Sequence, residues 1–108
     1  MVGTTLAALG AAMMLDAGML APPDDVGKLA DAIAIARTCP YLRLDENAIS
    51  RTMARQGIRL APLMPEIMTR SRAMEGRYIL TKSREACRLG RQLYGASGSA
   101  AAGFLAER

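Results

Sequence analysis

The sequence predicts an all-α protein, a small bundle of about four to five helices. The chain has 108 residues, of which 51% are hydrophobic and only 4% aromatic, so alanine, leucine, isoleucine and eight methionines must fill the core. These residues favour helices, whereas strands are rich in β-branched and aromatic side chains. Apolar residues also recur at helical spacing, and proline or glycine ends most of the runs.

Residues 1–21 form an apolar segment in which only Asp16 carries a charged side chain. Three interpretations stay open for it. The spacing of its apolar residues fits a buried helix. Its composition fits the remnant of an export signal, although no basic residue precedes the run. Its length suits a membrane anchor, although a carboxylate in lipid is costly. Residues 22–108 are then expected to form a single helical domain.

The first helix of that domain is expected over Val26–Cys39. Asp24 or Asp25 can cap its start, because a carboxylate accepts hydrogen bonds from the free amides of the first turn. Pro40 ends it, since proline cannot continue a helix and disfavours helical geometry in the residue before it.

A second helix is expected over Glu46–Gln56, after a short connection at Tyr41–Leu44. Asp45 is its predicted cap. Gly57 follows as the expected left-handed residue that stops a helix.

The pattern next predicts one long helix over residues 65–94, of roughly seven or eight turns. Pro65 suits its first position, and no other proline interrupts the segment. Ile79, Ala86 and Leu93 are spaced by seven and extend one apolar stripe along it.

A glycine- and serine-rich turn ends the long helix. Ser97 or Ser99 can then cap a last short helix over Ala100–Glu107, with Phe104 and Leu105 docking inward. No segment is predicted as a strand.

The two cysteines, Cys39 and Cys87, are separated by 48 positions. A disulfide between them would tie the first helix to the long helix and contribute about 4 kcal/mol by loop-closure entropy. Disulfides persist in oxidising compartments such as the periplasm. The alternative is a pair of buried, unpaired thiols in a cytoplasmic protein.

Charge is distributed unevenly along the chain, whose net charge is +4. Residues 32–108 carry thirteen basic and six acidic side chains. This excess is typical of a protein with an acidic partner, although a solvated helix face gives the same pattern. The candidate basic contact surface comprises Arg70, Arg77, Lys82, Arg84, Arg88 and Arg91.

Composition argues against most enzyme classes. The chain has no histidine, which removes the commonest general base and metal ligand and excludes Ser-His-Asp and Cys-His catalysis. There is no Cys-x-x-Cys motif for redox chemistry. Glu75 and Glu85 are better explained as ion-pair partners of neighbouring arginines than as catalytic carboxylates. We therefore expect no catalytic residues, no metal site and no cofactor.

Nucleic-acid binding is the alternative function. Glu46–Gly57 resembles half of a helix-turn-helix, in which Arg51, Arg55 and Arg59 would meet phosphates. The segment that follows holds two prolines and fits a tight three- or four-residue turn poorly. The three tyrosines are scattered in sequence and indicate no stacking platform for bases. Nucleic acid is thus a less favoured partner than protein.

A helix that ends in Cys39-Pro40, the motif Ala86–Gly90 (ACRLG) and a tail with Gly98 and Phe104-Leu105 together carry a family resemblance. Over roughly residues 27–108 the chain resembles a family of small exported helical proteins of unknown function from alphaproteobacteria. The resemblance implies a periplasmic location and a Cys39–Cys87 disulfide, and it implies no activity.

The sequence as a whole favours a non-enzymatic protein of the cell envelope. It would act through protein–protein interaction or as an accessory subunit of a larger complex, with membrane association through residues 2–21 as a further expectation. The alternative is a cytoplasmic nucleic-acid-binding module. The oligomeric state is left open.

Overall fold

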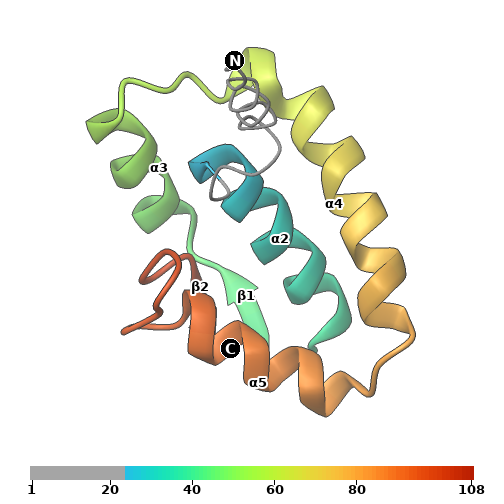
Figure 1. Ribbon diagram of the computed structural model, residues 1–108. Coiled ribbons are helices and arrows are strands. Elements are labelled where there is room, and N and C mark those ends of the chain that lie inside the picture. Colours follow the sequence, from blue (N-terminus) through green and yellow to red (C-terminus); the bar gives the residue numbers. More distant parts are fainter. Residues whose placement is uncertain (1–23) are drawn as a thin grey trace, which may run out of the picture.

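The computed structural model describes residues 24–108, and the predicted helical class is confirmed within them. The apolar segment 1–21 lies outside the described residues. Within residues 24–108, four α-helices dominate, and a two-stranded antiparallel sheet joins distant parts of the chain (Figure 1). In chain order the elements are α2 (Asp25–Thr38), β1 (Leu42–Leu44), α3 (Glu46–Arg55), the 3-10 turn η1 (Ala61–Leu63), α4 (Met64–Ile79), α5 (Ser83–Tyr94) and β2 (Leu105–Glu107).

Helix α2 lies at the centre of the molecule, with α4 alongside it and α5 crossing near the ends of both (Figure 1). Ala30, Ala32 and Ala34 of α2 are completely buried, and their small side chains let the neighbouring helices approach closely. Partly buried methionines of α4 pack against the core, which also contains Met53 of α3. Methionine therefore helps to fill the core, and its flexible side chain suits irregular gaps between helices.

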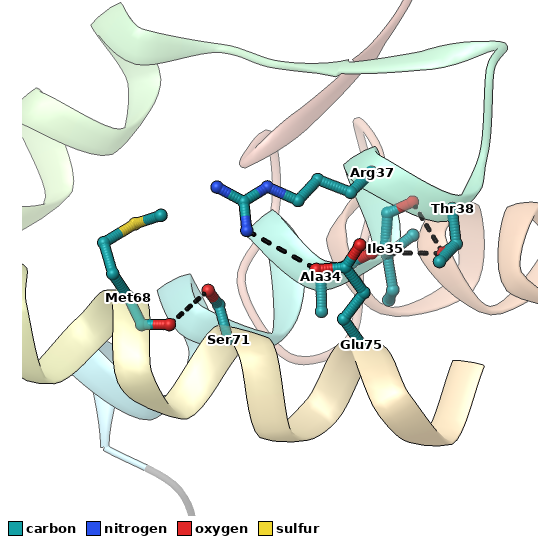
Figure 2. Close-up of polar contacts among 7 residues, drawn as sticks. All are labelled: Ala34, Ile35, Arg37, Thr38, Met68, Ser71 and Glu75. Atoms are coloured by element: carbon teal, nitrogen blue, oxygen red, sulfur yellow. Dashed lines mark hydrogen bonds and ion pairs between the residues drawn. The ribbon is translucent and has the colours of Figure 1, made fainter. Parts of the chain in front are cut away.

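Two polar features accompany the pairing of α2 with α4 (Figure 2). At the exposed edge, Arg37 of α2 forms an ion pair with Glu75 of α4, with Nη1 and Oε1 3.4 Å apart. Inside the interface Ser71 is completely buried, and its hydroxyl donates a 2.9 Å hydrogen bond to the carbonyl of Met68. A buried hydroxyl that is satisfied in this way carries no desolvation penalty for a missing partner.

The two helices predicted before residue 60 are confirmed, with ends that agree to within one residue. The Asp24 carboxylate accepts a 2.7 Å hydrogen bond from the Gly27 amide, and Asp45 accepts one of 3.0 Å from Ala48. Each cap of this kind contributes about 1 kcal/mol. Gly57 ends α3 with a φ of +71°, the left-handed geometry expected of it.

The prediction that residues 41–44 are only a connection and that 100–107 form a helix is wrong. Leu42–Leu44 and Leu105–Glu107 are strands that pair antiparallel, with Leu42 opposite Glu107. Neither segment is long enough to be recognised alone as a strand, because its hydrogen-bond partner lies some 60 residues away in the chain. Ser97 and Ser99 cap no helix. The inward docking predicted for Phe104 and Leu105 is confirmed, since both are buried.

The single long helix predicted over residues 65–94 is also wrong. α4 ends at Ile79, Lys82 has an extended backbone with ψ of 144°, and α5 begins at Ser83. The Thr81 hydroxyl donates a 2.8 Å hydrogen bond to the Tyr78 carbonyl, which competes with the helical hydrogen-bond ladder at this point. Ile79, assigned to the apolar stripe, is instead 67% exposed.

Gly90 of α5 lies where that helix contacts both strands and α2. A methyl group at this position would come within 2.7 Å of Ile35 Cγ2 and Leu42 Cδ1, both in fully buried side chains. We expect Gly90→Ala to lower the free energy of unfolding by about 1 kcal/mol. Overpacking costs roughly 1–3 kcal/mol, and the better helix propensity of alanine offsets about 1 kcal/mol of it. Urea denaturation followed by circular dichroism measures the change.

Gly76 of α4 provides the matched control for this substitution, because no atom lies within 4 Å of the position that its Cβ would occupy. Gly76→Ala should raise the free energy of unfolding by up to about 1 kcal/mol. Equal shifts for the two variants would contradict the close packing inferred at Gly90.

Candidate functional site

The disulfide predicted between Cys39 and Cys87 is confirmed, with the two Cα atoms 5.1 Å apart. Cys39 directly follows α2, and Cys87 lies in the second turn of α5. Both residues are buried, at 0% and 3% exposed. The bond ties the end of the central helix to the start of α5.

A second cross-connection, missed from the sequence, centres on Asp31 of α2. The hydroxyl of Tyr78 donates a hydrogen bond of 2.5 Å to Asp31 Oδ1. The hydroxyl of Tyr94 donates one of the same length to Asp31 Oδ2. We call these three residues the Asp31 clamp. The phenols come from α4 and α5, so the clamp fastens three helices together. In one continuous helix the two tyrosines would be about 24 Å apart along the axis, too far to meet one carboxylate.

The clamp borders a cavity of about 250 Å³ that is also lined by Arg77 and Met74. Burial, followed by the hydrogen bond to Asp31, raises the pKa of Tyr78 and Tyr94 well above the ordinary value of 10.0. Both phenols therefore remain protonated at neutral pH and act as hydrogen-bond donors. Such an arrangement holds the Asp31 carboxylate in place between two donors.

The raised pKa values predict a loss of stability at high pH. In the unfolded chain these phenols ionise near pH 10, whereas in the folded protein they resist ionisation. Their contribution is therefore complete below about pH 10 and is lost progressively as the pH rises further. Urea unfolding between about pH 8 and 11 should show this decline. The variant Y78F/Y94F is the control, and an equally steep decline in it would contradict the assignment.

The six residues of the predicted basic surface differ in the partners and cavities that they contact. Arg70 is paired with Glu66 at 2.6 Å and approaches Asp24 at 3.7 Å, and Arg88 is paired with Glu85 at 2.9 Å. Arg77 lies beside the Asp31 clamp. Lys82, Arg84 and Arg91 line one cavity at the start of α5. Three of the six basic residues thus line one cavity.

This cavity has a volume of about 590 Å³ and is lined by Tyr41, Lys82, Ser83, Arg84, Cys87 and Arg91. Arg91 also donates two hydrogen bonds, of 2.8 and 3.2 Å, to the Glu107 carboxylate, which hold the pKa of Glu107 below its usual range. Lys82 and Arg84 have no ion-pair partner within residues 24–108.

Exposed apolar residues lie in the wall of this cavity and in the turn that leads to it along the chain. Tyr41 in its wall is 64% exposed, and Ile79 and Leu80, just before Lys82 in the chain, are 67% and 87% exposed. We call the surface formed by Tyr41, Ile79, Leu80, Lys82 and Arg84 the α4–α5 corner. The sequence marked only its basic residues, Lys82 and Arg84, because the helical periodicity assigned Ile79 to the apolar stripe.

The glutamates considered for catalysis and the arginines considered for nucleic-acid binding lie in ordinary structural positions. Glu75 and Glu85 each form an ion pair with an arginine, as interpreted from the sequence. Arg51, Arg55 and Arg59 are exposed on α3 and just beyond it, and residues 56–63 separate α3 from α4. That separation is longer than the tight turn of a helix-turn-helix.

Residues 24–108 contain no group of three or more potential metal ligands among histidine, cysteine, aspartate and glutamate. Over the same residues, no helix has the length and hydropathy needed to cross a membrane. The chain matches no family model, no curated protein and no solved structure. The resemblance to small exported proteins therefore stays a prediction.

Proposed function

We propose that this protein is a non-enzymatic component of the cell envelope that acts by binding another protein, as an accessory subunit of a larger complex. The observation that carries the proposal is the α4–α5 corner, an exposed apolar and basic surface built beside a buried disulfide. A buried disulfide is typical of proteins in oxidising, extracytoplasmic environments. The periplasm is the compartment that we assign to it.

An interaction role fits the structural positions of the carboxylates. Asp24 and Asp45 cap helices, Asp31 holds the clamp, and most of the remaining carboxylates form ion pairs. These are structural tasks. The large apolar side chains left exposed within residues 24–108 are those of the α4–α5 corner, and exposed apolar clusters mark interaction sites.

Fractionation of cells that express the full chain at its natural level tests the proposal. The expected result is a chain in the envelope fraction whose thiols react with an alkylating agent only after reduction. Native electrophoresis should place it in an assembly with a second polypeptide, well above its own 11.5 kDa. Free thiols in the native protein, recovery from the cytoplasm, or migration of the chain alone would each overturn it.

A further inference from the structure

We propose that the α4–α5 corner docks an acidic segment of the partner protein, with apolar side chains of that segment on Leu80 and its carboxylates at Lys82 and Arg84. The inference rests on the proposed function, because it presupposes a protein partner. It adds where the partner binds and what chemistry its binding segment has.

The apolar part of the corner supplies the anchor. Leu80 is 87% exposed at the turn between α4 and α5, and Ile79 and Tyr41 are 67% and 64% exposed. No other large hydrophobic residue in the described chain is exposed to this degree. Covering such side chains removes apolar surface from water, which is the main driving force of protein association.

The basic side chains of the corner form no ion pair with the described part of the chain. Lys82 and Arg84 have no carboxylate partner within residues 24–108, and none of the residues that line the adjoining cavity is acidic. The neighbouring Arg91, by contrast, is neutralised by Glu107. A partner that brings carboxylates to this surface would complete the pairing and gain both specificity and a faster association rate.

The corner includes an open depression that a side chain of the partner can occupy. The cavity of about 590 Å³ opens between Tyr41 and the first turn of α5. The Cys39–Cys87 disulfide fixes the walls relative to each other, since Cys87 lines the cavity and Cys39 lies two residues before Tyr41. The backbone of these walls therefore loses little conformational freedom on binding.

Other occupants fit less well. A membrane surface would gain only about 1 kcal/mol for each of the two unpaired cations, and nucleic-acid-binding proteins commonly neutralise roughly 6–10 phosphates. A second copy of this chain that docked through the same surface would bring the same positive charges to Lys82 and Arg84, and like charges oppose association. An acidic protein segment with apolar anchors satisfies both parts of the surface.

The experiment measures fluorescence anisotropy of a labelled peptide of alternating glutamate and leucine residues, titrated with the oxidised full chain. We expect saturable binding that weakens about 10-fold or more in Leu80→Ser and in K82E/R84E. The same peptide with glutamine in place of glutamate should bind at least about 10-fold more weakly than the acidic one.

The matched control is R59E/R72E, which changes the net charge equally at exposed arginines outside the corner. It should leave the affinity within about 2-fold of the unmodified chain. Circular dichroism and the thiol count establish that every variant is folded and oxidised. Absence of peptide binding, equal weakening by R59E/R72E, or no effect of Leu80→Ser would overturn the proposal. So would tighter binding to vesicles of anionic lipid or to single-stranded DNA.

A second readout separates this inference from the proposed function. In envelope extracts, K82E/R84E should release the chain from its assembly, while R59E/R72E should leave the assembly intact. An assembly that survives K82E/R84E refutes docking at the corner and leaves the proposed function standing. An unmodified chain that is found alone refutes the proposed function itself.

Discussion

The variant C39A/C87A should lose about 4 kcal/mol of unfolding free energy relative to the oxidised protein, because the disulfide closes a loop of 48 residues. For a domain of this size the loss should lower the midpoint of thermal unfolding by roughly 15–30 °C. Alanine is the appropriate replacement, since both positions are buried and a serine hydroxyl there would lack a partner. Thermal melts monitored by circular dichroism measure the shift.

Reduction of the unmodified chain provides the control for this prediction. A reducing agent should lower its melting temperature by a similar amount and should leave that of C39A/C87A unchanged. A midpoint for the oxidised chain that is indifferent to reductant would show that the bond between Cys39 and Cys87 contributes nothing to stability.

Asp31→Ala should lower the free energy of unfolding by about 3 kcal/mol, the second-largest effect that we expect. It removes two hydrogen bonds to a charged acceptor, each of which contributes roughly 1.5–3 kcal/mol. It also leaves the hydroxyl of Tyr94, a residue only 3% exposed, buried without a partner. The hydroxyl of Tyr78 is less costly to release, because that residue is only partly buried and water can replace Asp31.

A double-mutant cycle isolates the clamp from general packing effects. Tyr94→Phe keeps the ring that stacks on Phe104, with centroids 6.3 Å apart, and removes only the hydroxyl. Because Tyr94 is hydrogen-bonded to Asp31, the combined variant D31A/Y94F should be destabilised by clearly less than the sum of the single changes. Strict additivity in urea denaturation would count against a direct Asp31–Tyr94 hydrogen bond.

Local rules correctly predicted the parts of the fold that neighbouring residues determine. Asp24 and Asp45 cap helices and Gly57 stops one because the groups that they satisfy lie within four residues. The same rules failed between Ile79 and Ser83. Seven-residue spacing continued across the break there, although Thr81 and Ser83 are weaker helix formers than the residues around them.

The candidate site was predictable only in its basic component. Lys82 and Arg84 stood among six basic residues of the predicted contact surface, and nothing in their spacing separated them from Arg70 or Arg88. What separates them is the placement of carboxylates, since Glu66 and Glu85 neutralise Arg70 and Arg88 along the same helices. Leu80 is exposed because the helix breaks there. The sequence did not predict that break, so it did not predict the exposure of Leu80 either.

The sequence by itself determined a helical chain, its capped helices before residue 57 and two cysteines available for one crosslink. Composition and short-range hydrogen bonding suffice for the first two, and the cysteine count supplies the third. Only the tertiary structure decided the Asp31 clamp, the pairing of Leu42–Leu44 with Leu105–Glu107 and the α4–α5 corner. Each of these joins residues that lie far apart in the chain, and the free energy that selects such contacts comes from burial that no local window contains.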